Sequence, residues 1–572
     1  MTAVAGRVAR LPGTTAFRPH PIGRTRSGTR RLVPGEGAVF FAGSLTLYLA
    51  FAALLVFGLD SIEGDAWSRV GNAFYMLYSR DPHLAAIGFV WNPLPSIALV
   101  PLLPFKELWP PLVEQGFAAN IVSALCMAGA VYQVRSILRE HGVARPATLI
   151  LTLLFALHPM ILLYAANGMS EAMFLFFGLT AVRHLTNWVK RREASTLVHA
   201  GLALALLYLT RYESIAIAGA AVLLVLVFSY LDARRGDRDA RTTALADAVI
   251  LAGPFVAAAG LWALASWVIV GNPFESFTSV YGFASQLEIG AAEIQASTGQ
   301  GTAAAPGYVV QQVMGIAPAL AVVGAGLVIA LVRRKPEALV PIVLLGASLA
   351  FSIWAFMSGR SWGNIRYYIV VVPLVTLAAG ALLARLNRRH AMASVRWPAN
   401  FLITGVILAL VALGLPAGLS AMHDQRVGRG TSDKVRLLVG SDSMQSEAVV
   451  SWQRQHEAAR ALDRHLDGLA LPSGSVLIDV AFGFPVVLQS RQPDIFVITP
   501  DRDFPAVLAD PAVFGVGYVV VTPPLGYGQV DAIERAYPGM YATGAGIADF
   551  VQQFGSGGDL GSWRLYQVRP RP

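Results

Sequence analysis

The arginines and lysines of this chain fall between long apolar segments in a regular alternation. From about residue 131 onward, every second gap between apolar segments is basic, while the other gaps are polar and carry carboxylates. Short loops rich in Lys and Arg stay on the cytoplasmic side of a membrane. The alternation therefore predicts a protein that crosses the bilayer many times, with the acidic gaps on the outer face. The basic gaps are residues 135–145, 190–192, 234–241, 333–335 and 385–389.

The composition agrees with this prediction. Hydrophobic residues make up 55% of the 572 residues and charged residues only 14%, which is typical of a polytopic membrane protein. Most of the net charge of +9 comes from the basic gaps and an Arg-rich leader, so membrane lipids are the expected partner and nucleic acid is not. The single cysteine, Cys126, excludes an intramolecular disulfide or a cysteine metal cluster.

The apolar runs set the expected number of spans. A spanning helix needs about 20 mostly apolar residues, and about eleven runs approach that length. They follow a polar, basic segment, 1–37, which predicts a disordered cytoplasmic tail, and an odd number of spans places the C-terminus outside. The runs are 38–59, 112–134, 148–166, 171–189, 197–211, 213–232, 244–270, 308–332, 337–357, 367–385 and 401–421.

One further apolar segment, residues 87–105, does not fit a span. It contains Asn92 and four prolines, and a helix there would move the 135–145 loop to the outer face. The charge bias therefore favours broken helices at the outer membrane surface. Non-helical backbone is tolerated there when protein or a wet cavity covers it.

The chain divides into a membrane domain and a soluble domain. Residues 38–422 form the predicted helical membrane domain, with outer loops at 60–111 and 271–307. Beyond residue 423 the apolar runs shorten to strand length and alternate with helical patterns, which predicts an α/β domain outside the cytoplasm over 423–572. The expected strands are 476–480, 495–498, 518–522 and 563–568.

Two acids in the outer gaps are candidate catalytic residues. Asp65 lies just beyond the first helix, where a positioned carboxylate can act as a general base on a hydroxyl. An ordinary solvated loop acid is the alternative, because such acids are usually exposed. Glu171 follows an Asn-Gly turn and opens an apolar helix, which helix capping alone would explain. A functional role is favoured because the turn faces the same side as Asp65.

Arginines in the outer gaps are candidate anion-binding residues. Arg211 and Glu213 interrupt two apolar runs, and ionisable groups at membrane depth are normally paired or face a cavity. A structural ion pair and a short surface turn are the simpler alternatives. Arg360 and Arg366 occupy the last outer gap and are followed by Tyr367. Guanidinium groups bind phosphate in a bidentate manner, so this gap can hold an anionic lipid phosphate.

The order of these motifs resembles the GT-C class of integral-membrane glycosyltransferases. The motifs are the carboxylate in the first outer loop, the run Trp91-Asn-Pro-Leu-Pro95, the pairs His158-Pro159 and Ser170-Glu171, and the late run Asn364-Ile-Arg-Tyr-Tyr368. The class includes protein O-mannosyltransferases, lipid A aminoarabinose transferases, oligosaccharyltransferase catalytic subunits and actinobacterial mannosyl- and arabinosyltransferases. The resemblance covers residues 38–390, and it leaves the subfamily open.

The resemblance implies transfer of a sugar from a polyprenyl-phosphate donor to a hydroxyl acceptor on the outer face. The acceptor is a glycan, a glycolipid or a protein. Asp65 and Glu171 match the catalytic acids. The donor phosphate is expected at Arg360, Arg366, Tyr367 and Arg211, and the substrate cavity at Asn92, His158, Tyr164, Asn167 and Glu213. The first loop lacks a paired Asp-x-Asp, which leaves open whether a divalent metal is used and whether Asp60 or Glu63 takes part.

Two other classes of function remain as alternatives. In a transporter or flippase of a lipid-linked intermediate, these residues would line a continuous path to the cytoplasm. In a membrane scaffold they would neither line such a path nor meet in one cavity. A catalyst should bring Asp65 and Glu171 to one outer cavity. The Arg- and Ala-rich sequence favours a bacterial inner membrane with a cytoplasmic N-terminus, and mannose or arabinose added to an envelope glycan or glycolipid.

Overall fold

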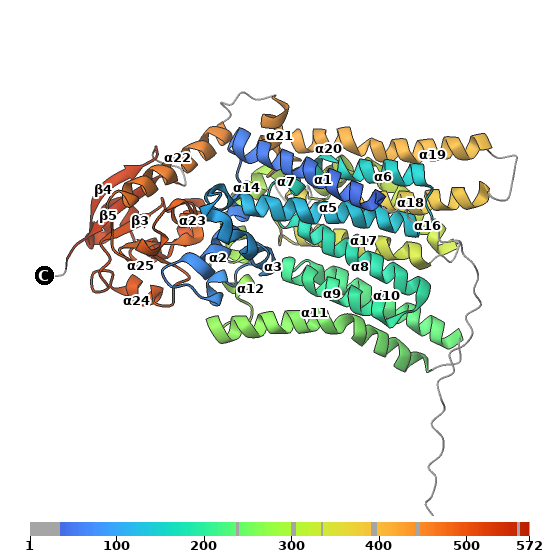
Figure 1. Cartoon of the computed structure of the whole chain (residues 1–572), viewed down its shortest axis with the longest axis horizontal. Coiled ribbons are helices and arrows are strands. Elements are labelled where there is room, and N and C mark those ends of the chain that lie inside the picture. The colour runs from blue at the N-terminus through green and yellow to red at the C-terminus, as the bar shows by residue number, and fades with distance from the viewer. Residues whose placement is uncertain are drawn as a thin grey trace, which may run out of the picture. The chain divides into compact units, whose positions relative to one another are not determined.

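The computed structural model describes residues 35–235, 239–298, 305–332, 336–390, 397–440, 447–556 and 561–570. Residues 1–34 and the basic gap 333–335 lie outside the described residues, so the tail expected over 1–37 stays a prediction. Residues 37–572 form one unit, in which long helices run side by side and a β sheet follows late in the chain (Figure 1).

The helical part is built from neighbours that pack along their lengths. α8 packs against α5 and α9, while α11 packs against α9 and α10. α11 leaves Val256, Leu261 and Val268 more than 60% exposed, and an apolar surface of this kind on a long helix suits a bilayer. The long helices are α1 (Glu36–Ala53), α5 (Phe117–Glu140), α8 (Glu171–Arg191), α9 (Ala194–Thr210), α10 (Ser214–Arg235), α11 (Ala240–Val270), α17 (Pro336–Met357), α18 (Val371–His390), α19 (Trp397–Ala412) and α20 (Gly414–His423).

The expected number of eleven spans is not confirmed. Within the described residues, seven helices are long and apolar enough to cross a membrane, and nine if each of two bent helix pairs counts as one span. The two remaining runs, 171–189 and 197–211, form helices that do not meet the requirements for a membrane span, each for its own reason. α8 carries Arg183, Lys190 and Arg191 within its 21 residues, and α9 has only 17 residues.

Proline breaks two of the expected helices. The run 148–166 is split into α6 (Arg145–Ala156) and α7 (Pro159–Ala166), which meet at 57°. The run 308–332 is split into α15 (Ala305–Ile316) and α16 (Ala321–Val332), with a 3₁₀ turn between them and a bend of 93°. Pro159 and Pro318 stand at the breaks, because proline has no N–H to continue a helix.

The two loops predicted to lie outside, 60–111 and 271–307, are folded into short helices. The amphipathic α2 buries Trp67, Val70 and Phe74, and the Trp67 indole donates to the Val113 carbonyl oxygen at 3.0 Å. Residues 87–105 form no spanning helix, as predicted. The first loop contains α2 (Gly64–Tyr78), η2 (Leu84–Ile87), α3 (Leu94–Ile97), η3 (Val100–Glu107) and α4 (Pro111–Glu114); the second contains α12 (Glu275–Thr278), α13 (Phe283–Ile289) and α14 (Ala291–Thr298).

The C-terminal part contains a small mixed sheet of five strands in the order β2-β1-β3-β5-β4. The first three strands are parallel, with Val476 paired to Phe496 on one side and to Tyr518 on the other. β5 and β4 continue the sheet antiparallel. The strands are β1 (Val476–Ile478), β2 (Phe496–Ile498), β3 (Tyr518–Val521), β4 (Ala548–Phe554) and β5 (Trp563–Val568). Four of them lie in the runs that predicted strands, whereas β4 was not predicted.

Helices surround this sheet and connect it to the membrane helices. α23 packs against both α2 and α22, and Figure 1 shows α2 beside the C-terminal elements. The boundary at residue 423 coincides with the end of α20, but the division into domains stays a proposal. The helices are α21 (Ser432–Val439), α22 (Glu447–Asp467), α23 (Val480–Gln489), α24 (Phe504–Ala509), α25 (Ala532–Ala536) and α26 (Met540–Thr543).

Candidate active site

Asp65 lies in the first turn of α2. The helix begins at Gly64, so the carboxylate sits at the positive end of the helix dipole, which favours its ionised form. The side chain is 39% exposed. Burial raises the pKa of Asp65, but the positive charges of Arg366 and Arg69 outweigh it, so the pKa lies below its ordinary value. Asp65 is therefore an ionised carboxylate that is open to a ligand.

The turn between α7 and α8 packs on the start of α2. Gly168 has a φ of +78°, and a Cβ atom there would lie 2.9 Å from the Cβ of Ala66 and 3.0 Å from the Cβ of Ala119. Glycine alone combines this backbone conformation with so close an approach. The contact brings the N-terminus of α8, and with it Glu171, to the side of the molecule that holds Asp65.

Alternating charges connect the acids of the site. Arg366 Nη1 lies 3.3 Å from Asp65 Oδ2, and Arg366 Nε lies 3.8 Å from Glu171 Oε1. Arg211 Nη1 donates to the same Glu171 oxygen at 2.8 Å, and Arg211 Nη2 donates to Glu213 Oε1 at 2.6 Å. Buried charges persist when they are paired in this way. Asp65 and Glu171 thus share one arginine.

The open side of this ion-pair chain faces a cavity of about 260 Å³, the first cavity. Four arginines and two acids line it, so its walls carry a surplus of positive charge. An enclosed space with several guanidinium groups is suited to an anion, above all to phosphate. The charged residues are Asp65, Arg69, Arg211, Glu213, Arg366 and Arg429.

Arg69 was not singled out from the sequence. It lies one turn after Asp65 on α2 and is only 6% exposed. Its Nε and Nη1 atoms have no hydrogen-bond partner among the described residues, and its guanidinium lies 5.5 Å from the centre of the Trp91 ring. Burial lowers the pKa of Arg69 despite the opposing charges of Asp65 and Glu171. The spacing Asp65-x-x-x-Arg69 was visible in the sequence, because residues four apart meet on one helix face.

Arg429 also escaped sequence reasoning. It follows α20, and its Nη1 donates to the Trp362 carbonyl oxygen at 3.0 Å. Its guanidinium lies 5.6 Å from the centre of the Trp362 ring. No local pattern marks this arginine, since its place in the first cavity depends on how the segment after α20 folds back over the last outer gap.

A larger cavity of about 830 Å³, the second cavity, adjoins the first. Its walls come from the two predicted outer loops, from the end of α11 and from the C-terminal elements. The two cavities share the side chains of Asp65, Trp91, Gln286 and Tyr527. Asp65 therefore stands at the junction between a cationic space and a roomier one.

The two other acids of the first loop are held by cations of the C-terminal part. Asp60 lies 3.4 Å from Arg460 and 3.6 Å from His456, and Glu63 is paired with Lys434. Burial raises the pKa of Asp60, but these two partners outweigh it and the pKa lies below its ordinary value. Both acids connect the first loop to the C-terminal part, whereas Asp65 faces the first cavity.

The other residues predicted for the site divide into two groups. Asn92, Glu213 and Tyr367 line the first cavity, and Arg366 lies 5.4 Å from the centre of the Tyr367 ring. Glu171 lines neither cavity: it is 2% exposed and lies behind the arginines. The four other predicted residues also line neither cavity. These remaining residues are His158, Tyr164, Asn167 and Arg360.

Their contacts explain these positions. His158 accepts from the Met160 N–H at 3.2 Å and so caps α7 at the break. Asn167 Nδ2 lies 3.5 Å from Glu63 Oε1. Arg360 is exposed, and its guanidinium lies 5.5 Å from the centre of the Trp354 ring. The placement of Arg360 gives no support to its expected role at the donor phosphate.

The charged side chains nearest to Asp65 are arginines. Within the described parts of the chain, no three His, Cys, Asp or Glu side chains are grouped so that they could hold a metal ion. Divalent cations such as Mg²⁺ need oxygen ligands. The neighbours of Asp65 are instead arginines, which can supply the positive charge themselves.

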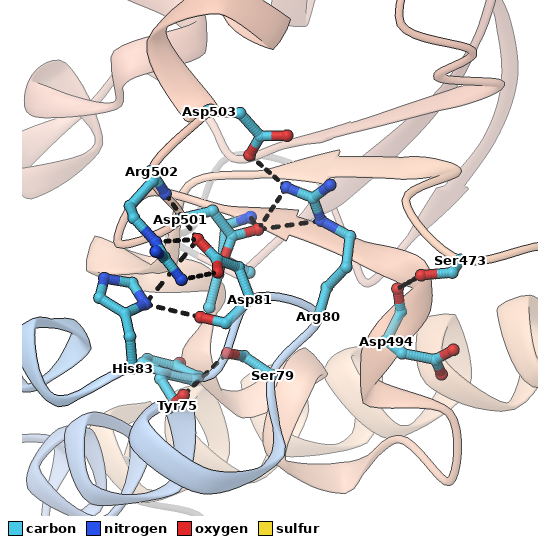
Figure 2. Close-up of polar contacts among 11 residues, drawn as sticks. Tyr75, Ser79, Arg80, Asp81, His83, Ser473, Asp494, Asp501, Arg502 and Asp503 are labelled. Carbon is cyan, nitrogen blue, oxygen red and sulfur yellow. Dashed lines mark hydrogen bonds and ion pairs between the residues drawn. The ribbon is translucent and has the colours of Figure 1, made fainter.

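A second set of ion pairs holds the C-terminal part on the first loop. Figure 2 shows the Arg80 guanidinium between Asp501 and Asp503, and Arg502 against Asp81. Arg80 Nη2 lies 3.0 Å from Asp501 Oδ2, and Arg502 Nη2 lies 2.6 Å from Asp81 Oδ1. These pairs fix the loop that leads from α2 to Trp91 and so stabilise one wall of the second cavity.

Comparison with known proteins defines the fold. No protein-family model and no curated protein sequence matches the chain. Among solved structures, ArnT from Cupriavidus metallidurans bound to undecaprenyl phosphate aligns with a TM-score of 0.50 and 13% identity, over 94% of this chain and 100% of that chain. The archaeal oligosaccharyltransferase AglB from Archaeoglobus fulgidus, in complex with an inhibitory peptide and a dolichol-phosphate, aligns with a TM-score of 0.42 and 11% identity, over 85% of this chain and 70% of that chain. The similarity to ArnT shows a shared polytopic membrane fold of the GT-C type.

Proposed function

We propose that this protein is a membrane glycosyltransferase that moves a sugar from a polyprenyl-phosphate donor to a hydroxyl acceptor. The observation that carries the proposal is the position of Asp65 at the junction of a cationic cavity and a larger cavity. The shared fold with ArnT, a protein bound to undecaprenyl phosphate, supports a lipid-phosphate donor. The fold by itself does not fix a function, so the argument rests on the site.

The first cavity is the proposed site of the donor phosphate. Its four arginines against two acids give it the charge that a phosphodiester requires. Arg69 contributes guanidinium nitrogens that have no hydrogen-bond partner among the described residues. These two nitrogens expose almost no surface, so Arg69 adds unpaired positive charge beside the phosphate site.

The proposed reaction is a displacement at the anomeric carbon of the donor sugar. The acceptor hydroxyl, entering from the second cavity, forms a new C–O bond to that carbon and gives its proton to Asp65. The bond between the anomeric carbon and the phosphate oxygen breaks, and its electron pair stays on the phosphate. The leaving phosphate monoester carries one negative charge more than the diester, so Arg366 and Arg69 stabilise the transition state.

The proposed base becomes stronger when the donor binds. In the free protein the arginines hold the pKa of Asp65 below its ordinary value. An anionic phosphate beside them offsets part of their positive charge, which raises the pKa of Asp65 in the complex. Proton transfer is most efficient when the pKa of the base lies near the working pH. Donor binding therefore prepares Asp65 for the proton of the acceptor.

Glu171 is proposed to act through the arginines. It is buried and lines neither cavity, but its Oε1 atom holds Arg211 at 2.8 Å and lies 3.8 Å from Arg366. A carboxylate in this place orients two guanidinium groups toward the phosphate. Glu171 is therefore a positioning residue, whereas Asp65 touches the reacting groups.

The cavities favour an enzyme over a transporter. Among the described residues, their linings come from the predicted outer gaps, from adjoining helix ends (Thr210, Ile269 and Val270) and from the C-terminal part, and no described residue of the basic gaps contributes. A transporter needs a path that continues to the cytoplasmic face of the membrane. We further propose that residues 423–572 lie outside the cytoplasm of a bacterial inner membrane and that the basic gaps face inward.

The decisive experiment is a donor assay with the purified protein in detergent. Polyprenyl phosphates carrying mannose, arabinose and other sugars are incubated with the protein, and loss of the sugar from the lipid is measured. One donor should lose its sugar, and Asp65→Asn should slow the loss by roughly 100-fold or more. A protein that turns over none of these donors, while binding polyprenyl phosphate, would contradict the proposed function.

A further inference from the structure

The geometry points to a neutral saccharide as the acceptor, held in the second cavity on aromatic side chains that the C-terminal part supplies. This inference rests on the proposed function and names its acceptor class. The first step of the argument is size. At about 830 Å³ the second cavity is about three times as large as the first, and it lies within the range of about 300–1,000 Å³ typical of sites for small organic ligands.

The second step is the aromatic lining. Trp91 and Tyr281 contribute from the outer loops, while Trp452, Phe482 and Tyr527 contribute from the C-terminal part. The rings of Phe482 and Tyr527 are stacked, with centroids 6.0 Å apart. The C–H face of a sugar ring is apolar and its rim carries hydroxyls, so aromatic faces with polar tips suit it. The aromatic side chains of the loops and those of the C-terminal part can therefore hold one sugar chain between them.

The third step is charge. The lysine and the arginine that line the second cavity are already paired with acids of the protein: Lys434 with Glu63, and Arg502 with Asp81. Asp479 accepts hydrogen bonds from the Tyr281 hydroxyl at 2.9 Å and from the Ala532 N–H at 2.7 Å.

Glu275 accepts from the Asn272 side chain at 3.0 Å, and Asp65 is paired with Arg366. An anionic ligand would have to displace Glu63 or Asp81 from its cation and would also meet the other acids of the lining. An uncharged ligand would do neither, and this separates the second cavity from the cationic first cavity.

The fourth step is an unmatched hydrogen-bond donor. Trp563 lines the second cavity and is 3% exposed. Its indole Nε1–H has no hydrogen-bond partner among the described residues, and leaving a buried donor unsatisfied is unfavourable by about 1–3 kcal/mol. A sugar hydroxyl that reaches the edge of the Trp563 ring would satisfy this donor, whereas a purely apolar occupant would leave it unmatched.

The experiment compares neutral saccharides with a neutral peptide. The full-length protein in detergent, without donor, is titrated with neutral oligosaccharides of mannose, arabinose and glucose, with oligogalacturonate, and with a capped uncharged Ser/Thr peptide. Binding is followed by tryptophan fluorescence and by saturation-transfer NMR. At least one neutral oligosaccharide should bind at millimolar concentration or below, oligogalacturonate should bind more weakly, and the peptide should not bind.

Two variants assign the binding to the cavity. Phe482→Ala removes a stacked ring from the wall and should weaken saccharide binding by about 3- to 10-fold, as expected for one aromatic contact. Phe514→Ala removes a ring that is 50% exposed in the same part of the chain and lines neither cavity, so it should leave binding unchanged. Unchanged melting temperatures would show that both variants are folded.

The outcomes separate this inference from the proposed function. Peptide binding that depends on Phe482, or failure of every neutral oligosaccharide to bind, would overturn the saccharide acceptor. The donor assay on the same preparation is independent, because water can also accept the sugar. Sugar loss from the donor without saccharide binding refutes only the inference. Saccharide binding without any donor turnover refutes the proposed function and leaves a saccharide site without an acceptor role.

Discussion

Arg366 Nη1 lies 3.3 Å from Asp65 Oδ2, although 301 positions separate the two residues in the sequence. The contact joins the start of α2 to the last outer gap. Because Arg366 also approaches Glu171, it gathers the two acids of the proposed site. A charged pair at the boundary of a cationic cavity can exchange its partner for a phosphate.

The first prediction concerns Asp65. Asp65→Asn keeps the size of the side chain but removes the proton acceptor, so turnover should fall by roughly 100-fold or more. Donor binding should survive, because the arginines remain and one negative charge beside the phosphate is lost. The measurements are kcat from sugar loss and donor affinity from an equilibrium titration.

Asp60→Asn is the matched control for Asp65→Asn. Asp60 is a first-loop acid that pairs with Arg460 and His456, so its loss should lower thermal stability more than kcat. If Asp65→Asn retained full turnover, the base would have to be Glu63, which lines the second cavity beside Asp65.

The second prediction concerns pH. The pKa of Asp65 lies below its ordinary value in the free protein, and a bound anion raises it. Activity requires the ionised carboxylate and falls as the pH drops through the pKa. The profile of kcat/KM reports the free protein and that of kcat reports the complex, so kcat should fall at a higher pH than kcat/KM. Coincident acid limbs would show that the donor does not share the arginines with Asp65.

How much of the site was readable from the sequence depends on the range of each interaction. Asp65 and Arg366 could be singled out because ionisable side chains next to membrane segments are unfavourable unless they are paired or functional. Arg69 was missed although it is local, because an arginine on an amphipathic helix is usually a surface residue. Arg429 could not be predicted from the sequence, because it reaches the first cavity only when the segment after α20 folds back. Arg360 stays a prediction: it is exposed beside Trp354 and lines neither cavity, so its placement lends no support to a role at the phosphate.

The fold was readable to a similar extent. Apolar length predicted most of the helices, but the breaks at Pro159 and Pro318 were read as continuous spans. Short buried runs predicted four strands. β4 was missed because its residues are mostly exposed and a bulge between Phe550 and Gln552 interrupts its alternation. An edge strand of this kind is defined by its partner, β5, and the sequence does not contain that pairing as a pattern.

The third prediction compares two arginines of one outer gap. Arg366 lines the first cavity, whereas Arg360 is exposed beside Trp354. Arg366→Ala should weaken donor binding by about 10-fold or more, since a charged hydrogen bond contributes about 1.5–3 kcal/mol. Arg360→Ala should have little effect on donor titrations. Equal losses from the two variants would mean that these arginines only contact lipid headgroups.

The fourth prediction concerns topology. In a Cys126→Ser background, Arg145→Cys should be protected from a membrane-impermeant maleimide in intact cells, and Phe514→Cys should be labelled. The reason is that basic gaps stay in the cytoplasm and the C-terminal part follows the last helix to the other face. Permeabilised cells, in which both cysteines should react, provide the control. Labelling of Arg145→Cys from outside would invert the proposed orientation.

The fifth prediction concerns Asp463, a buried acid on α22. Burial raises its pKa to about 7, and the nearby charge of Asp467 adds to this effect. Asp463 Oδ1 has no hydrogen-bond partner among the described residues. Because the pKa in the folded state exceeds that of the unfolded chain, the folded protein binds the extra proton between about pH 4 and pH 7, and stability falls as the pH rises through that range.

Above pH 7 the ionised carboxylate destabilises this part of the fold, by an amount on the order of a few kcal/mol. Asp463→Asn should therefore slow hydrogen–deuterium exchange of α22 at pH 8, with little effect at pH 5. Asp549→Asn is the matched control: Asp549 is exposed, and the Arg569 guanidinium holds its pKa below the ordinary value, so the variant should bring no such gain. Equal exchange of α22 in Asp463→Asn and the parent protein at pH 8 would mean that water or a cation already satisfies the buried carboxylate.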